Sequence, residues 1–352
     1  MSGGVVADPA PPRIRFTDER IEMAHGAGGK ASRRLVEGLI APLFANETLA
    51  PLADAAIFPV AACRIATTAD AFVVKPLRFA GGSIGELCIN GTLNDLAVSG
   101  ACPRTIMVSL ILEAGLETAT LRAELEAMAA AAARAGVAIA GGDTKVVEHG
   151  ACDRMFVTTF GVGVVDERLR LGAQHVRKGD RVLLSGPIGD HGITILLARG
   201  ELELEADLRS DTRSVWPMVR ALLDAVPDGV RWMRDPTRGG VATALNELAR
   251  DAGCAIALHE DAIPLRSEVR GACEILGLDP LHIANEGQFL AVVAERDAQR
   301  ALEAVRAVAG GEDAALVGTV QSEPARAVVG ITGYGGTRMI DMLVGDPLPR
   351  IC

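Results

Sequence analysis

Thr105-Ile106-Met107-Val108-Ser109-Leu110-Ile111-Leu112 is the stretch that decides the fold, because it alternates as a β-strand and begins a regular series of elements. It is followed by apolar residues at helical spacing, which are Leu121, Leu125, Met128 and Ala132. They indicate an amphipathic helix that ends before Gly136. A short strand at Val137–Ala140 and a longer one at Met155–Val165 complete the series. This succession predicts an α/β unit in which helices cover a sheet.

The flanking sequence extends this prediction to two domains. Upstream, Ala62–Thr68 and Ala71–Lys75 are predicted strands and Ser83–Ser99 a predicted helix. Downstream, the chain turns charged around Asp166–Gly179, and a second series of strands and helices begins at Arg181. We therefore expect a two-domain α/β (α+β) protein. Its predicted parts are a flexible leader at 1–20, an N-terminal domain at 21–165, a C-terminal domain at 175–340 and a mobile tail at 341–352.

Composition excludes several classes of protein. The 352 residues carry a net charge of −10, which disfavours non-specific binding to nucleic acid because that requires a basic surface. The seven cysteines are scattered and form no C-x-x-C pair, which is typical of a reducing compartment. No apolar run approaches 18 residues, and the N-terminus lacks the build of a signal peptide. We expect a cytoplasmic protein without membrane contact.

The C-terminal tail ends on a thiol, in Pro347-Leu348-Pro349-Arg350-Ile351-Cys352. The two prolines favour extended geometry, so the segment is predicted to be a solvated, mobile arm. A thiol on such an arm suggests a carrier that is loaded at one place and emptied at another. Most terminal cysteines have no such role, so both interpretations stay open at this point.

A glycine loop precedes the first predicted helix, which we expect from Ala31 to Phe44. Gly28, Gly29 and Lys30 lead into it, and free N–H groups at a helix start attract phosphate. The loop is not a Walker A motif, because Ala24 stands where that motif needs glycine. It is a candidate phosphate site of low specificity.

Carboxylates at the edges of predicted elements are candidate metal ligands. They are Asp54, Asp70, Asp95 and Asp143. Phosphoryl transfer needs hard oxygen ligands to hold Mg²⁺ against phosphate oxygens. Each aspartate alone is more often a cap or turn residue. Asn94, one helical turn after Asn90, is either part of a ligand face or a satisfied core hydrogen bonder.

Two further polar positions have competing interpretations. Glu286 lies between Asn285 and Gly287, just before the predicted strand Gln288–Ala294, and is a candidate base or a turn carboxylate. His191, beside Asp190, is interpreted as a residue that starts a helix.

Seven short motifs, in order along the chain, resemble the HypE family of carbamoyl dehydratases, which belongs to the PurM-like ATP-binding superfamily. They are His25–Gly29, Asn90–Ala97, Gly142–Val147, Ser185–Gly192, Met233–Gly240, Ala284–Gly287 and Pro349–Cys352. The closing tetrapeptide separates this family from relatives such as thiamine-phosphate kinase. The resemblance implies an N-terminal domain that dimerises through its sheet and a C-terminal α+β domain. ATP would lie between the domains, near the dimer interface.

The resemblance also implies the activity. A carbamoyltransferase partner places a carbamoyl group on the terminal thiol, here Cys352. The enzyme dehydrates it with ATP to a thiocyanate, and the cyanide passes to the iron-scaffold complex of [NiFe]-hydrogenase maturation. The implied cofactors are ATP and Mg²⁺. The implied nucleotide-binding residues are Gly28, Gly29, Lys30, Asp70, Asn94, Asp95, Asp143, Thr144, Asp235 and Arg238.

The chemistry requires a metal–nucleotide site, a base near the amide nitrogen and a mobile carrier. The four aspartates are the candidates for the metal–nucleotide site. Glu286, together with Lys145, is the candidate for the base, and the tail that ends in Cys352 is the candidate for the carrier. Our hypothesis is that Glu286 is the general base and that Lys145 orients it. Two alternatives remain, another ATP-dependent kinase or synthetase of the superfamily and a non-catalytic, ATP-regulated thiol carrier.

Overall fold

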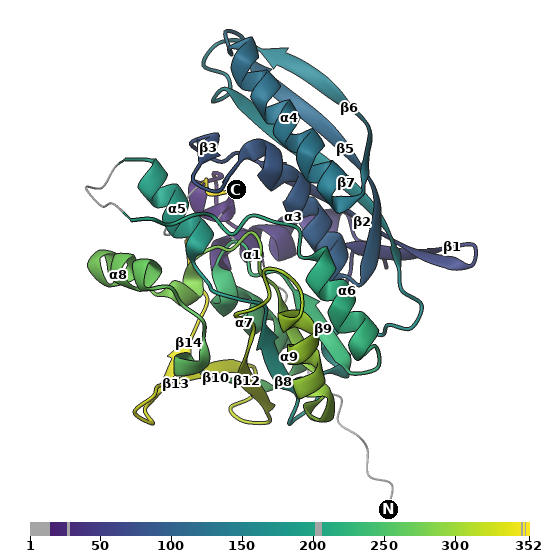
Figure 1. Ribbon diagram of the computed structural model, residues 1–352, viewed down its shortest axis with the longest axis vertical. Helices are drawn as coiled ribbons and strands as arrows, with labels where there is room; N and C mark the ends of the chain where they lie inside the picture. Colours follow the sequence, from purple (N-terminus) through teal and green to yellow (C-terminus); the bar gives the residue numbers. More distant parts are fainter. Residues whose placement is uncertain (1–14, 27–28, 201–205, 346–347, 349) are drawn as a thin grey trace, which may run out of the picture.

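The computed structural model describes residues 15–26, 29–200, 206–345, 348 and 350–352. Two sheets, each with helices packed on it, form two domains that meet at a central helix, α3 (Figure 1). The expected two-domain architecture is confirmed. Residues 1–14 of the predicted leader lie outside the described residues. The domain boundaries that we drew stay predictions.

The N-terminal sheet has the strand order β1-β2-β7-β5-β6. Its strands are β1 (Ala56–Val60), β2 (Cys63–Phe72), β5 (Ala101–Glu113), β6 (Ala138–Val147) and β7 (Met155–Val165). Strands β5 and β6 run parallel, joined by helix α4 (Thr118–Ala135), while the other pairs are antiparallel. A small ribbon, β3 (Arg78–Phe79) with β4 (Gly82–Ser83), leads into α3 (Ile84–Val98). Helices α3 and α4 cover one face of this sheet.

The C-terminal sheet has the order β14-β13-β10-β12-β8-β11-β9. Its strands are β8 (Arg181–Leu184), β9 (Val230–Arg234), β10 (Ala255–His259), β11 (Leu290–Val293), β12 (Ala315–Gln321), β13 (Ala327–Ile331) and β14 (Thr337–Ile340). Its helices are α5 (Asp190–Ala198), α6 (Trp216–Ala225), α7 (Gly240–Ala252), α8 (Ser267–Leu276) and α9 (Ala298–Arg306). Strands β10 and β13 are parallel, and the remaining pairs are antiparallel.

Helix α3 belongs to two of the three hydrophobic cores among the described residues. Leu93 and Leu96 pack in the N-terminal core, whereas Ala97 and Val98 pack in the core built around α6 and α9. The helix is therefore buried almost all round, and glycine and alanine within it allow this close approach. Its Asn94 faces the junction between the domains.

Several predicted elements differ from the observed ones. Strand β2 runs without a break through Ala69 and Asp70, where we had expected two strands, because it pairs with β7 throughout that region. Strand β6 is longer than predicted and includes Gly141 to Val147, because it pairs with β5 along its full length. Strands β1, β9 and β14 were not predicted, and α6 begins only at Trp216.

The predicted first helix is also broken up. It comprises α1 (Lys30–Leu35), a π-helical turn at Val36–Ile40 and α2 (Ala41–Leu43). Within the described part of the chain, no helix has the length and apolar character needed to cross a bilayer.

Candidate active site

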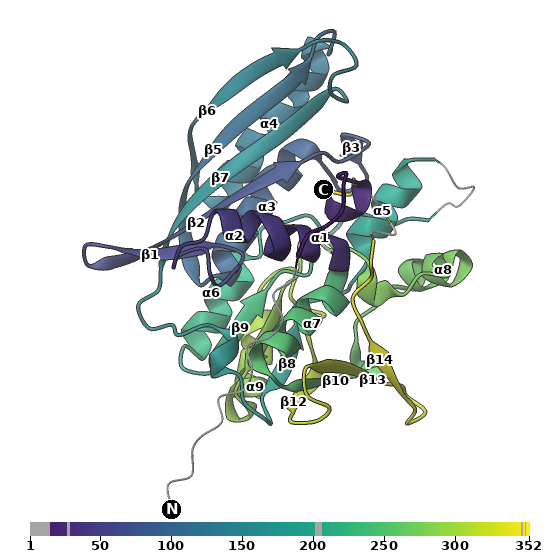
Figure 2. The ribbon, with the colours of Figure 1, turned by 180° about the vertical axis from the view of Figure 1, so that it is seen from behind.

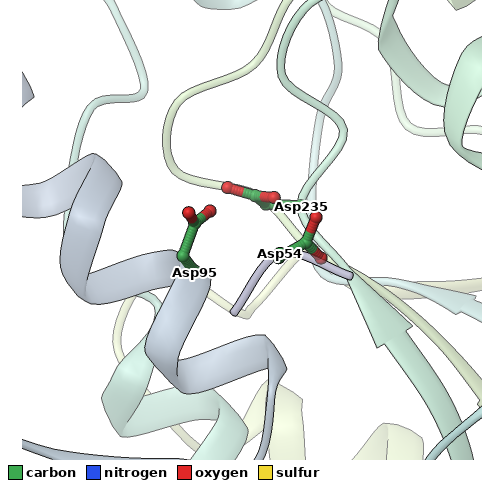
Figure 3. A group of neighbouring side chains, drawn as sticks. All are labelled: Asp54, Asp95 and Asp235. Carbon is green, nitrogen blue, oxygen red and sulfur yellow. The ribbon is translucent and has the colours of Figure 1, made fainter. Parts of the chain in front are cut away.

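Three aspartates converge where α3 meets the C-terminal domain (Figure 3). Asp95 is on α3, Asp54 precedes β1, and Asp235 follows β9. One carboxylate oxygen from each lies within 4.8 Å of the others. This spacing lets three oxygens approach a single cation.

The charges at this cluster, which we call the aspartate trio, are poorly balanced within the chain. Burial raises the pKa of Asp95 well above its usual range, and the neighbouring carboxylates Asp70, Asp235 and Asp54 raise it further. Burial and the charge of Asp54 raise the pKa of Asp235 to about 8. Arg234 Nε lies 3.0 Å from Asp54 and offsets part of this negative charge. A hard divalent cation such as Mg²⁺ fits this donor set of oxygens.

Asp70 is near the aspartate trio but is held separately. It lies on β2, and its carboxylate accepts a hydrogen bond from Thr92 Oγ1 at 2.6 Å. Burial raises the pKa of Asp70, and the charge of Asp54 adds to that rise. Thr68, two residues earlier on the same strand face, donates to Asp95 at 2.7 Å. The alternation of β2 thus directs two polar side chains toward α3.

Glu286 lies fully buried beside this group. Its Oε1 has no hydrogen-bond partner among the described residues. Burial raises its pKa well above the usual range, the charges of Asp235, Asp211 and Asp70 raise it further, and Arg238 opposes the rise. The carboxylate of Asp211 accepts hydrogen bonds from the backbone N–H groups of Glu286 at 3.1 Å and Gly287 at 3.0 Å.

Asp211 is therefore a site residue that the sequence did not reveal. It fixes the loop that carries Glu286, but it lies 75 residues away in the chain and in no motif that we recognised. Asp235 was predicted to bind nucleotide, not metal, although its position after a strand was a usable signal.

The described part of the tail packs against the N-terminal core instead of extending into solvent. Leu348 and Ile351 are buried, and Cys352 is partly buried against the N-terminal core. The expectation of a solvated arm is therefore wrong for these residues, because their apolar side chains gain from burial.

The cysteine end of the tail is held just beyond the end of β2. The N–H of Val73 donates to the Cys352 carbonyl at 3.0 Å. The ring of the preceding residue, Phe72, lies against Gly91, where an added Cβ would be 3.0 Å from the ring and 3.9 Å from Glu286 Oε2. Gly91 therefore keeps this region open for a close approach.

Asn94 bonds residues of the C-terminal domain. Its amide nitrogen donates to the carbonyls of Arg213 at 3.0 Å and Glu286 at 3.2 Å, and its oxygen accepts from Val215 N–H at 2.8 Å. These bonds join the two domains, and a nucleotide-binding role for Asn94 stays a prediction.

The glycine loop also differs from the prediction. The N–H groups of Lys30 and Ala31 are not free, because they donate to the carbonyls of Leu343 and Val344. The Lys30 ammonium pairs with Asp341. Gly28 lies outside the described residues, while Gly29 contacts the backbone of Leu343 so closely that a Cβ would collide with it. Arg238 does reach this loop, where it donates to the Gly26 carbonyl.

Asp143, Thr144 and Lys145 are not brought to the aspartate trio of their own chain. Asp143 pairs with Ser109 and Lys145 with Ile111 across β6 and β5. Because paired residues point to the same face, both charges lie on the face opposite the buried Ile106 and Leu112. The two side chains pair with each other at 2.6 Å, and both are exposed. Lys145 therefore does not orient Glu286 within one chain.

Comparisons with known proteins establish the family. Residues 52–165 match the N-terminal domain of AIR synthase related proteins, and residues 177–330 match the C-terminal domain. A curated relative from Azotobacter vinelandii, carbamoyl dehydratase HypE, is 49% identical over 340 residues, which is 97% of this chain and 99% of the relative. The chain belongs to the carbamoyl dehydratase HypE family. The resemblance predicted from the seven motifs is confirmed.

Solved structures of HypE proteins give the same result. One HypE, in a HypE–HypF complex, is 39% identical with a TM-score of 0.84 and covers 88% of this chain and 99% of its own. A HypE in complex with ATP is 42% identical with a TM-score of 0.79 and covers 94% of this chain and 99% of its own. The predicted two-domain PurM-like fold and the enzyme class are confirmed.

The aspartate trio can be tested by changing Asp235. With a pKa of about 8, Asp235 is mostly neutral at pH 7 when no cation is bound, so Asp235→Asn should leave the metal-free melting temperature nearly unchanged. The same change should weaken Mg–ATP binding about tenfold or more, because a ligand oxygen is lost. Calorimetry gives both quantities, with Asp228→Asn as a surface control. Unchanged Mg–ATP affinity in Asp54→Asn, Asp95→Asn and Asp235→Asn would remove the metal assignment.

Proposed function

We propose that this chain uses ATP to dehydrate a carbamoyl group carried on Cys352, giving a thiocyanate, ADP and phosphate. The cyanide would then be donated to the iron of [NiFe]-hydrogenase through a scaffold complex. The observation that carries the proposal is the docked tail, whose terminal residue bonds Val73 just after β2. The ring of the neighbouring Phe72 lies against Gly91 on α3, the helix that carries Asp95. Family membership supports the enzyme class, and the ATP complex of a relative supports the nucleotide.

The reaction balances in two steps. The oxygen of the S-carbamoyl group takes the γ-phosphoryl group of ATP, which turns it into a good leaving group. The nitrogen loses both protons as the carbon–oxygen bond breaks, so phosphate leaves and a nitrile remains on sulfur. The base that takes a proton from nitrogen must lie near the loaded thiol, and we assign this role to Glu286, a buried carboxylate beside the aspartate trio.

The aspartate trio would hold Mg²⁺, with Asp70 beside it. When bound, Mg²⁺ supplies positive charge that holds and neutralises the phosphates of ATP. The negative charges of Asp235 and Asp70 contribute to the raised pKa of Glu286. Positive charge at the trio would offset them, which makes Glu286 easier to ionise and therefore a better base.

The reaction can be followed directly by mass. A carbamoyltransferase partner would load Cys352, and the complex of a related HypE with HypF supports a protein partner of this kind. Intact mass of the loaded chain should fall by one water after Mg–ATP is added, with phosphate released in equal amount. Loss of the whole carbamoyl group, or no change in mass, would contradict the proposal.

We also propose that the chain works as a homodimer joined through the N-terminal sheet. In Figure 2, α4 lies behind this sheet and no labelled helix covers the side of β5, β6 and β7 that faces the viewer. Large apolar side chains are exposed on the uncovered face, including Met107, Ile111 and Phe160. Such a surface is typical of a protein interface. Light scattering should show twice the 36.6 kDa mass of one chain.

In such a dimer, Asp143 and Lys145 would reach the site of the other copy. They lie on the proposed interface and away from their own aspartate trio. Lys145→Ala and Glu286→Gln should each be inactive alone. When the two variants are produced together, a mixed dimer has one complete site, so roughly a quarter of the wild-type conversion should return. No recovery would mean that Lys145 acts within its own chain or not at all.

A further inference from the structure

The docked tail is held by a strand-like set of hydrogen bonds. Val73 N–H donates to the Cys352 carbonyl at 3.0 Å, and Lys75 N–H donates to the Arg350 carbonyl at 3.3 Å. The tail is not a regular strand, because Arg350 has a φ of +56°. The carbonyl between the two, that of Ile351, bonds neither Val73 nor Lys75, and its partner comes from another element.

That partner is His191. Its Nε2 lies 2.6 Å from the Ile351 carbonyl oxygen, and the side chain is completely buried at the start of α5. A carbonyl oxygen only accepts hydrogen bonds, so Nε2 must carry the proton. The sequence had suggested only that His191 starts a helix, and nothing in the dehydration chemistry above uses it.

Ser210 fixes this tautomer. Its hydroxyl oxygen lies 2.7 Å from His191 Nδ1 and also accepts the N–H of Thr212 at 3.1 Å. The Ser210 hydroxyl therefore donates to Nδ1, and Nε2 is left with the proton that the tail needs. The edge-on ring of Phe79, with its centroid 5.5 Å from that of the imidazole, restricts the ring orientation. Burial lowers the pKa of His191 to about 4, so the ring is neutral at physiological pH.

We propose that His191 is a positioning residue. Its hydrogen bond to the Ile351 carbonyl holds the docked tail in one register and thereby places the Cys352 thiol at the reaction site. The proposal rests on the proposed function. A slip of the tail by one residue would move the Ile351 carbonyl away from His191. The His191 N–H would then lose its acceptor, and Ile351 would leave the apolar core. The hydrogen bond thus selects the one register in which residue 352 occupies the site.

The first test measures how often the thiol leaves its docked position. His191→Phe removes the donor and keeps an aromatic ring, and alkylation of Cys352 by iodoacetamide is followed by peptide mass spectrometry. A single hydrogen bond is worth enough to raise the alkylation rate about threefold to tenfold. His191→Gln keeps an N–H donor and should restore part of the protection. An unchanged rate in a folded His191→Phe protein would overturn the proposal.

A matched control and a second variant keep this test decisive. Thr194→Val changes another buried side chain on α5, with a near-identical shape and no hydrogen bond from its hydroxyl to any described residue, and should leave the alkylation rate unchanged. An equal rise in Thr194→Val would mean that any disturbance of α5 releases the tail. Should His191→Phe fail to fold, His191→Leu decides, because it also removes the donor to the Ile351 carbonyl and leaves an apolar side chain in the buried position. Faster alkylation in His191→Leu supports the proposal, and an unchanged rate overturns it.

The same variants separate this proposal from the proposed function. On pre-carbamoylated protein, His191→Phe should slow single-turnover dehydration while Mg–ATP affinity stays the same. If the wild-type chain makes no thiocyanate, the proposed function fails, but the alkylation result still judges the role of His191. If wild type and His191→Phe convert equally fast with equal alkylation, the role of His191 fails and the proposed function stands.

Discussion

Cys352→Ala should abolish tail carbamoylation and thiocyanate formation completely while Mg–ATP affinity is unchanged. The side chain at position 352 supplies the sulfur that carries the group, and none of the predicted nucleotide ligands is altered. A few residues appended after Cys352 should have a similar effect, since the partly buried carboxyl end has little room for them. Carbamoylation is followed by intact mass and phosphate release by a coupled assay.

The internal cysteines provide the control for this prediction. Burial raises the pKa of Cys273 to about 11 and that of Cys88 still further, so neither is a ready nucleophile. Cys63, in contrast, is exposed on β2. Cys63→Ala should therefore behave as wild type. Carbamoyl transfer mapped to Cys63, or undiminished small-molecule phosphorylation by Cys352→Ala, would favour a different enzyme of the superfamily.

Glu286→Gln should slow dehydration by at least about a hundredfold, since general-base catalysis is typically worth that much. Glutamine has nearly the same shape, and the backbone contacts of the loop with Asp211 and Asn94 remain. ATP binding and tail loading should therefore persist. Single-turnover conversion of pre-carbamoylated protein is the measurement, because it separates chemistry from loading.

The pH dependence gives a second view of the same residue. The pKa of Glu286 is raised, so its ionised, basic form is lost as pH falls, starting above the usual glutamate range. The rate of conversion by the wild type should therefore rise with pH as Glu286 ionises. The rate of the Glu286→Gln variant should lack this dependence on pH. A glutamine variant that converts at nearly the normal rate would show that Glu286 only supports its loop.

The sequence indicated the grouping of site residues where local patterns determine their position. Asp70 and Asp95 were chosen as candidates because they stand beside small residues at the edges of predicted elements, and their carboxylates are neighbours in the structure. Asp143 does not join the aspartates of its own chain, because β6 extends through it and it is exposed on the uncovered face of the sheet. Its role at the site of a second copy stays a prediction. Whether a strand ends or continues depends on pairing with β5, which is a long-range property that a single segment does not encode.

The remaining differences have a similar cause. Asn94 was undecided because its partners, Arg213, Val215 and Glu286, come from a different domain. The tail was expected in solvent because its prolines dominate its local preference. Its docking depends on Val73, Lys75 and His191, each more than 150 residues away in sequence.

Helix α3 ties the two domains to one another. The helix is shared by two cores, and Asn94 bonds residues of the C-terminal domain, so rotating one domain against the other would break contacts on both sides at once. Heat should consequently melt both domains in a single cooperative transition.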